Sequence, residues 1–333
     1  MVSLSTVRSH NAGLKELGPG LVAVFVGGTS GIGETTAKEF VRNTVEPRVY
    51  IVGRNEEQAS RILEELKKIN PSGTNTFIKS DVSLLRNVDI ACEEIKAQEG
   101  QVNLLCLSPG YLSLESRTET PEGLDKKLNL NYYSRLRFVH QLLPQLNQAS
   151  AAGRLSSVLS VLGAGNEGKM YLDDMSLKKN YNIVNCLRHA TMMNSFAAEE
   201  LAKAHPGTKF IHAYPGVVKT NIAQGFGAIM RPVMRAVMAL STPFTVDIKE
   251  SGERHLYAAT SNVYPPSAKA GGDAVSGIDG AKGSGAYRLN WDGSVVGKDS
   301  LLKEYRSQGV GKKIWDHTLE VFEKVCGKDG GKW

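Results

Sequence analysis

Three glycines near the amino terminus have the spacing of a phosphate-binding turn. Gly27, Gly31 and Gly33 lie in VGGTSGIG, after the apolar run 21–28 and at the start of residues with helical spacing. Glycine lets the main chain turn tightly and approach a ligand closely, and the amide groups at a helix start favour negative charge. A strand, a glycine turn and a helix in this order predict a site for the pyrophosphate of a dinucleotide.

Apolar runs and helical stretches alternate along the chain. The expected strands are 21–28, 48–53, 76–82, 102–110, 154–161, 209–216 and 286–291. The expected helices are 33–43, 56–70, 84–98, 124–147, 181–204 and about 300–326. This order predicts an α/β fold, a single Rossmann-type doubly wound parallel sheet with helices on both faces and an added C-terminal helix. Ligands of such sheets bind beyond the carboxyl ends of the strands.

Composition limits the class of protein and its partners. The 333 residues are 41% hydrophobic and 22% charged, with a formal net charge of +6, which suits an acidic ligand such as a phosphorylated cofactor. The basic residues are dispersed, so we expect no nucleic-acid partner. The four cysteines form no CxxC pair and are expected to be reduced thiols, and no metal site is expected. With neither a signal peptide nor an apolar run long enough to cross a bilayer, a cytoplasmic protein without stable membrane insertion is expected.

The chain is expected to form one domain over 1–333, without a linker or an internal repeat. Residues 221–245 contain Phe226, Ile229, Met230, Met234 and Met238, and they are expected to form an adaptable apolar lid over a small hydrophobic substrate. Residues 296–333 are expected to form a C-terminal helical extension. This extension could cover a surface used for dimerisation, so both a homodimer and a monomer are open.

The glycine spacing, three residues and then one, resembles that of the short-chain dehydrogenase/reductase family. The resemblance covers a dinucleotide-binding core of about residues 20–295 and continues through Asp81-Val82, Asn131, Ser160, Pro215-Gly216 and Thr220. Among the branches of the family, MVSLSTVR, GIGE and YYSRLRF look most like fungal short-chain reductases of secondary metabolism. The chain departs from the family at Val26 and at residues 107–110, which are expected to alter support of the adenine more than the chemistry.

The resemblance implies a set of cofactor-binding residues. They are Gly27, Thr29, Ser30, Gly31, Ile32, Gly33, Arg54, Asp81, Val82, Pro109, Gly110, Asn131, His189, Pro215, Gly216, Val218 and Thr220. At the end of the second strand, members that prefer NAD usually have a carboxylate, whereas this chain has Gly53-Arg54. A guanidinium there suits a 2′-phosphate, which favours NADP(H) as the cofactor.

The catalytic pair of the family is absent. A family tyrosine gives a proton to the substrate, a lysine four residues later binds the nicotinamide ribose, and a serine stabilises the developing oxyanion. Counting back from Pro215 with the family's spacing puts Asn185 at the tyrosine position and His189 at the lysine position. In another register Tyr181, one turn before Asn185, takes the tyrosine role. The catalytic candidates are therefore Ser160, Asn131, Tyr181, Asn185 and His189.

Three functions remain open from the sequence. The first is NADPH-dependent reduction of a carbonyl, imine or conjugated alkene in a hydrophobic natural-product intermediate, with Tyr181 or His189 replacing the usual proton donor. The second is a non-redox cyclase, isomerase or dehydratase that retains NADP(H) as a structural element. The third is a pseudoenzyme that binds NADP(H) and a partner protein without turnover.

Overall fold

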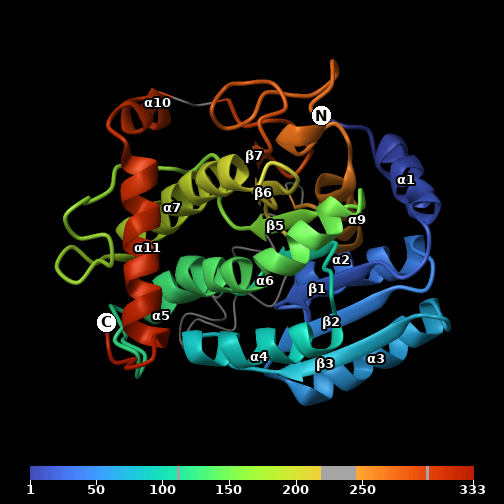
Figure 1. Ribbon diagram of the computed structural model, residues 1–333, viewed down its shortest axis with the longest axis horizontal. Coiled ribbons are helices and arrows are strands. Elements are labelled where there is room, and N and C mark those ends of the chain that lie inside the picture. Colours follow the sequence, from blue (N-terminus) through green and yellow to red (C-terminus); the bar gives the residue numbers. More distant parts are fainter. Residues whose placement is uncertain (111–112, 219–244, 298–299) are drawn as a thin grey trace.

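The computed structural model describes residues 1–110, 113–218, 245–297 and 300–333, and it confirms the predicted α/β class. A seven-stranded parallel sheet runs through the centre in the order β3-β2-β1-β4-β5-β6-β7 (Figure 1). The strands are β1 (Val22–Val26), β2 (Arg48–Gly53), β3 (Thr74–Lys79), β4 (Leu104–Leu107), β5 (Ser157–Val161), β6 (Lys209–Ala213) and β7 (Ala286–Leu289). Strand order reverses between β1 and β4, which is the position where such sheets bind ligands.

Helices cover both faces of the sheet. One face carries α1 (Leu4–Ala12) with the short turn η1 (Gly13–Leu17), α2 (Gly31–Asn43), α3 (Glu56–Ile69) and α9 (Ile248–Thr260). The other carries α4 (Leu85–Gln98), α5 (Lys126–Leu128), the π-turn η2 (Asn129–Tyr133), α6 (Ser134–Ala151), α7 (Ile183–Ala204), α10 (Ser300–Ser307) and α11 (Val310–Cys326). A short turn, η5 (Ser267–Lys269), follows α9. Asn55 caps α3 and Asn182 caps α7, each by accepting a main-chain N–H of the first turn.

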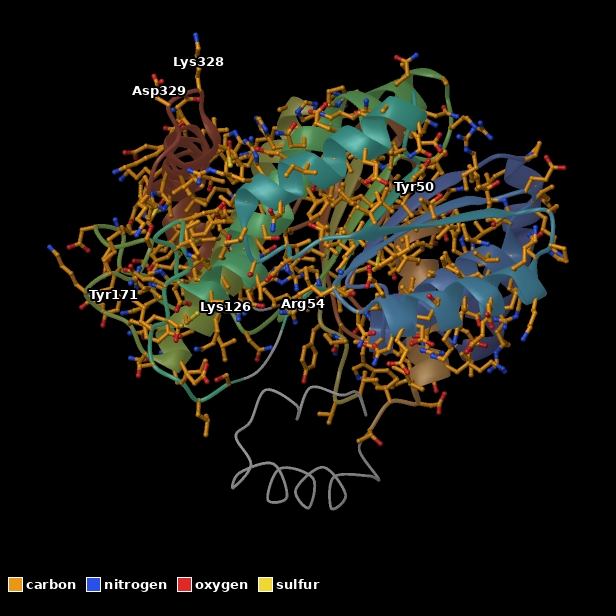
Figure 2. All side chains as sticks on the ribbon, turned by 90° about the horizontal axis from the view of Figure 1, so that it is seen from below. Tyr50, Arg54, Lys126, Tyr171, Lys328 and Asp329 are labelled. Carbon is orange, nitrogen blue, oxygen red and sulfur yellow. The ribbon has the colours of Figure 1, made fainter. Side chains whose placement is uncertain are left out.

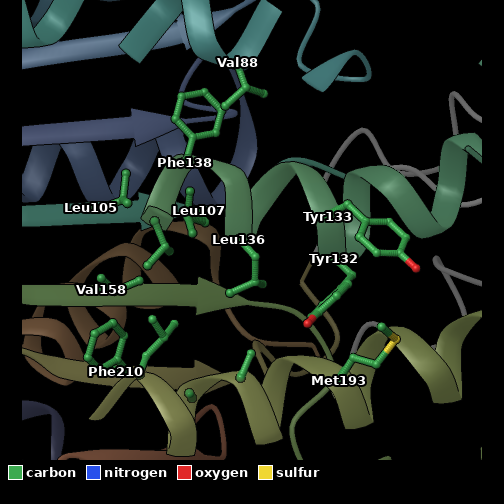
Figure 3. Close-up of a cluster of buried hydrophobic side chains, with 14 of the residues drawn as sticks. Val88, Leu105, Leu107, Tyr132, Tyr133, Leu136, Phe138, Val158, Met193 and Phe210 are labelled. Carbon is green, nitrogen blue, oxygen red and sulfur yellow. The ribbon is translucent and has the colours of Figure 1, made fainter. Parts of the chain in front are cut away.

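The core between α6, α7 and the sheet is apolar and fully buried. Figure 3 shows the ring of Phe138 of α6 beside Val88 of α4, and Leu136 of α6 pointing toward the strand that carries Val158. Strands β1, β4, β5 and β6 are buried along their whole length, as expected for a parallel sheet covered on both faces. This packing fixes the strand ends that carry the candidate site.

Two helices were not predicted, and one predicted helix is divided. In α1 only Val7 and Asn11 are buried, so a single apolar residue marks its inner face. In α9 every residue from Ser251 to Thr260 is buried, so no apolar period distinguishes one face. The helix expected over 300–326 is divided between α10 and α11, where Gly309 has φ +68°.

The C-terminal extension lies across the helical layer. Figure 1 shows α11 crossing α7 and reaching α4. The terminal Trp333 donates its indole N–H to Ser176 Oγ (2.7 Å), and its main-chain N–H to the carbonyl of Glu122 (2.9 Å). The lid predicted for 221–245 lies outside the described residues except for its last position, and the domain limits stay predictions.

Candidate active site

The glycine turn lies where the sequence placed it, between β1 and α2. Gly27 has φ +81°, and an added Cβ there would lie 2.9 Å from the main-chain nitrogen of Pro109. A Cβ on Gly33 would lie 2.5 Å from Ser108 Oγ and 2.7 Å from the carbonyl oxygen of Gly27. The turn therefore packs directly against the end of β4, and only glycine fits at these two positions. This cradle and the amino terminus of α2 fit the pyrophosphate of a dinucleotide.

The end of β2 packs against this turn. A Cβ on Gly53 would lie 2.7 Å from Cγ2 of Thr29, so Arg54 follows a strand end that touches the turn. Arg54 is exposed, and Figure 2 shows it between the half of the molecule with β1–β3 and the half with α5–α7. Glu34, in the first turn of α2, is paired with Lys38 and Arg61 (2.5 and 3.0 Å), which compensates its charge. The arrangement leaves Arg54 accessible to an anionic ligand.

The other cofactor candidates follow strand ends at the same edge. Ser30 is the N-cap residue of α2, and Ile32 packs against the core below it. After β3, Asp81 accepts from the main-chain N–H of Ser83 (3.1 Å), and Val82 is buried. The remaining candidates follow β4 and β6, namely Pro109, Gly110, Pro215, Gly216 and Val218. Thr220 lies outside the described residues.

A π-turn interrupts the helix that carries Asn131. It comprises Asn129–Tyr133, and such turns occur frequently at functional sites. The Asn131 carbonyl accepts a hydrogen bond from Asn194 Nδ2 of α7 (2.8 Å). A Cβ added to Gly110 would lie 3.1 Å from Asn131 Oδ1, so the side chain faces the end of β4. Asn131 thus connects β4 to α7.

Ser160 lies one residue before the end of β5, between Leu107 of β4 and His212 of β6. Its hydroxyl accepts a hydrogen bond from Arg135 Nη1 (2.9 Å) and donates one to Asn194 Oδ1 (3.1 Å). Ser160 is 9% exposed, and Arg135 is 1% exposed. A buried guanidinium on α6 therefore polarises the hydroxyl predicted to be catalytic.

Arg135 was not predicted as a site residue. Besides Ser160, it donates to the carbonyl oxygens of Leu107, Pro109, Leu130 and Val161, at 2.5 to 3.1 Å. No carboxylate of the described residues pairs with it. Burial lowers the pKa of Arg135 to about 9, so the side chain is still a cation at neutral pH. The positive charge consequently lies at the carboxyl ends of β4 and β5.

The structure does not bring Asn185 of α7 to Ser160. Asn194 contacts Ser160, and at 1.5 Å per residue Asn185 lies about 13 Å before it along the helix, on the opposite face. Asn185 Nδ2 donates to the carbonyl of Asn180 (2.8 Å). Tyr181 precedes the helix and lies near Lys127 (5.7 Å from the ammonium to the ring centre) and Cys186.

His189 is also turned away from Ser160. It lies about 140° around the helix from Asn194, and it is fully buried. Its Nε2 accepts the main-chain N–H of Tyr171 (3.0 Å), and its Nδ1 lies 3.4 Å from the carbonyl oxygen of Met175. The α7 residues on the Asn194 side are Thr191 and Leu187, whereas the expected register names His189 and Asn185, whose roles stay predictions.

Two neutral side chains occupy the α7 face toward Ser160. Thr191 and Leu187 precede Asn194 by three and seven residues, which places them on its side of the helix. A Cβ on Gly163, three residues after Ser160, would lie 3.0 Å from Thr191 Oγ1, which confirms the direction of this face. Hence neither a tyrosine nor a lysine stands at these two positions.

A second buried polar chain holds the turn after Ser160. The N–H of Gly163 points to His212 Nε2 (3.3 Å), and His212 Nδ1 lies 2.9 Å from Ser195 Oγ. Ser195 donates to Glu167 (2.7 Å), which pairs with Arg288 (3.1 Å). Burial, followed by the charges of Arg135 and Arg288, lowers the pKa of His212 to about 3, so His212 is neutral at physiological pH. Its contacts with Gly163 and Ser195 hold the turn after Ser160.

Exposed apolar side chains gather on the segments around this edge. They are Leu114 after β4, Tyr171 between β5 and α7, Val184 and Leu187 in the first turns of α7, and Val217 after β6. All lie on segments that follow the carboxyl ends of parallel strands. Exposed apolar side chains on such segments suit contact with an apolar ligand.

Within the described residues, no cluster of three or more His, Cys, Asp or Glu side chains could hold a metal ion. No helix in this part of the chain has both the length and the apolar character needed to cross a membrane.

Comparisons with known proteins agree on one family. A model of the short chain dehydrogenases matches residues 21–171. Oxidoreductase AN1596 of Emericella nidulans is 44% identical, over 98% of this chain and 99% of that protein. Short-chain dehydrogenase/reductase SAT2 of Stachybotrys chartarum is 32% identical, over 99% of each. The NADPH-bound carbonyl reductase from chicken fatty liver has the same fold, with a TM-score of 0.58 and 18% identity, over 84% of this chain and 100% of that one.

Proposed function

The chain belongs to the short-chain dehydrogenase/reductase family and is an oxidoreductase, and from this premise we propose that it is an NADPH-dependent reductase of a hydrophobic natural-product intermediate. The reducible group is a carbonyl or an alkene conjugated to a carbonyl. The observation that carries this proposal is the hydrogen bond between the buried Arg135 and Ser160 (2.9 Å).

The charge of Arg135 selects among the candidate substrates. Hydride addition to a carbonyl or to a conjugated alkene develops negative charge on oxygen, and a nearby buried cation stabilises it. An iminium ion would instead bring a second positive charge toward the guanidinium. We therefore favour an oxygen electrophile over an imine.

Ser160 makes the direct contact in this proposal. Its hydroxyl hydrogen points to Asn194 Oδ1 (3.1 Å), and a substrate oxygen would replace that acceptor. Arg135 keeps donating to Ser160 Oγ, so the hydroxyl is a stronger donor than an isolated serine. Asn194 is held through its own amide by Asn131 and Ala190 (both 2.8 Å), which keeps the site ordered when substrate displaces its oxygen.

The cofactor side rests on the glycine cradle. Gly27, Gly33 and the start of α2 would hold the pyrophosphate, and Arg54 would pair with a 2′-phosphate, which favours NADPH over NADH. When bound, NADPH supplies the hydride. Thr191 stands nearest to the lysine position of the family and would offer a hydroxyl to the nicotinamide ribose in place of an ammonium.

The source of the proton differs from that of the family pattern. Leu187 and Thr191 on the α7 face are not acids at neutral pH. The negative charge formed on the substrate is therefore held by Ser160 and Arg135 until a solvent proton arrives. The same features suit the second candidate, a non-redox isomerase or cyclase, because polarisation of an oxygen by Ser160 requires no proton from α7.

Stereospecifically deuterated NADPH distinguishes these functions. Purified protein is incubated with hydrophobic ketones, enones and iminium salts of matched carbon skeletons, and the products are analysed by mass spectrometry. Deuterium in the ketone or enone product supports the proposal, and preferential labelling of the iminium product contradicts it. Product formed without consumption of NADPH supports the non-redox function instead.

Substitution of Ser160 tests its role directly. Ser160→Ala should lower turnover by roughly 100-fold with little change in NADPH affinity, because the contact to the oxyanion is lost. Ser157→Ala is the matched control, since Ser157 is buried on the same strand and its hydroxyl has no hydrogen-bond partner among the described residues. Equal turnover in the two variants would remove Ser160 from the mechanism.

A further inference from the structure

A cavity of about 790 Å³ lies at the amino ends of β5 and β6. Its walls come from α1 and η1, the turn before β5, the start of β6 and the segment after α9. Ser156 lines it, and Ser160 stands four residues further along β5, about 13 Å away at strand spacing. Figure 1 shows α1 on the side of the molecule away from α11. The cavity is therefore separate from the candidate active site.

A buried lysine lines this cavity. Lys209 is 2% exposed, and its ammonium donates to the carbonyl of Ser261, the C-cap residue of α9 (2.8 Å). None of the carboxylates that the structure describes lies within ion-pair distance of it. An ammonium has three donors, and a buried cation without a counter-charge is costly. Lys209 thus has donors and a charge that a ligand can satisfy.

Other basic groups surround the same space. The ring of His10 lies 3.0 Å from Thr260 Oγ1, and its pKa is lowered by burial and then by the charge of Lys209, so the two bases are close. Arg154 and Lys269 also line the cavity, and they donate to main-chain carbonyls (2.7 and 3.1 Å).

The negatively charged side chains of the cavity wall lie at its rim. Glu16 and Asp273 line the cavity, and both are exposed. Water screens charges in such positions. The deep part of the cavity is therefore basic and its wall is partly apolar, through Leu14, Leu155 and Pro265.

We propose that this cavity binds an organic anion, with a carboxylate or phosphate group at Lys209 and His10 and an apolar body against Leu14, Leu155 and Pro265. The volume is that of a site for a small organic molecule. This site and its ligand are independent of the reaction proposed at Ser160, because the two lie at opposite ends of β5.

Proton uptake should accompany binding. Burial lowers the pKa of Lys209 to about 7, so near neutral pH part of the population has a neutral amine. A bound anion favours the ammonium and raises this pKa. Binding near pH 7 should then take up protons, and affinity should fall as the pH rises above neutrality.

Calorimetry with three probes of similar size tests the proposal. Phenyl phosphate and benzoate carry the two anionic groups, and benzamide is the uncharged control. We expect saturable binding of at least one anion, at least 10-fold weaker binding of benzamide, and a heat that depends on the ionisation enthalpy of the buffer. Equal affinity for benzamide, or no saturable binding of either anion, would overturn the proposal.

Variants at the two ends of the sheet test where the anion binds. Lys209→Met should weaken anion binding 10-fold or more and reduce proton uptake at pH 7. His10→Gln, a milder change at a half-buried position, should weaken binding about threefold and serves if Lys209→Met does not fold. Arg54→Ala, at the opposite edge, should leave binding unchanged. An anion whose affinity depends on Arg54 and not on Lys209 or His10 would contradict the site.

Discussion

The two sides of the candidate active site are determined by different kinds of residues. Beside β1 and α2 the site is made of main chain, because Gly27 and Gly33 let the turn meet Pro109 and Ser108 at distances that no side chain permits. Beside β5 and α7 it is made of side chains that reach across elements, as Arg135 of α6 does to Ser160.

This difference explains which family features persist in the chain. The cofactor side needs glycine and a helix start, and both are present in their usual order. The reaction side needs a particular functional group at a particular helical position, and the α7 face toward Ser160 carries Leu187 and Thr191, neither of which is a tyrosine or a lysine. In the proposed reaction the charge of Arg135, from α6, stabilises the developing oxyanion.

Arg135 should have the largest effect on catalysis. Arg135→Met removes the cation and the donor to Ser160, so turnover should fall by roughly 100- to 1000-fold, while NADPH affinity changes less than about threefold. Arg135→Lys keeps the charge and should recover at least about 10-fold of this loss. Steady-state kinetics measures the loss of turnover, and NADPH titration measures the change in cofactor affinity. Thermal melting checks that the variants are folded. Parallel losses of NADPH binding and turnover would indicate a structural role only.

Gly33 should have the next largest effect, this time on cofactor binding. Gly33→Ala forces the turn away from Ser108 and Gly27, at a cost of about 1–3 kcal/mol, so NADPH affinity should fall roughly 10- to 100-fold. Gly13→Ala is the control, because a Cβ at Gly13 has no atom within 4 Å. Fluorescence titration measures both variants. If the two bind NADPH equally, the turn is not the pyrophosphate cradle.

Local sequence signals predicted the strands and the position of the glycine turn. Apolar runs marked the buried strands, and glycine spacing marked the turn, because each property is visible within a few residues. Ser160 was predicted from its match to the family's catalytic serine near the end of the strand expected over 154–161. The helix α9 lacked such a signal, since it is buried on all sides from Ser251 to Thr260.

The residues of α6 and α7 that contact Ser160 could not be predicted from local sequence patterns. Most of α7 from His189 to Ala202 is buried, so no apolar stripe showed which face meets the sheet, and the register taken from the family spacing pointed to Asn185 and His189. Asn194, through its bond to Ser160, identifies the face. Arg135 was missed because its partners lie on main chain and side chains about 25 residues away or more, apart from Leu130.

Arg54 should have an intermediate effect, on the preference for NADPH over NADH. Arg54→Ala should weaken NADPH binding about 10-fold, the typical contribution of one charge-assisted contact, and leave NADH binding nearly unchanged. Arg61→Ala is a matched control, because Arg61 already pairs with Glu34 and Glu65 (3.0 and 2.7 Å). The ratio of the two dissociation constants is the measurement. If the affinities for NADPH and NADH fell equally, Arg54 would not contact the 2′-phosphate.

His189 should have the smallest effect on function, because it bonds the loop before α7 rather than the site. Glutamine can also accept from Tyr171 and donate to Met175, so His189→Gln should keep turnover and NADPH affinity within about twofold and cost about 1 kcal/mol of stability. Burial lowers the pKa of His189, so the unfolded chain takes up a proton there before the folded one does. Stability should therefore fall as the pH drops below the ordinary histidine value of about 6.5, and less so in the variant. Denaturant titrations at pH 7 and pH 5 measure this difference. A tenfold rise in the KM for NADPH would indicate that His189 contacts the nicotinamide ribose. It would contradict the assignment of Thr191 and Leu187 to the α7 face toward Ser160.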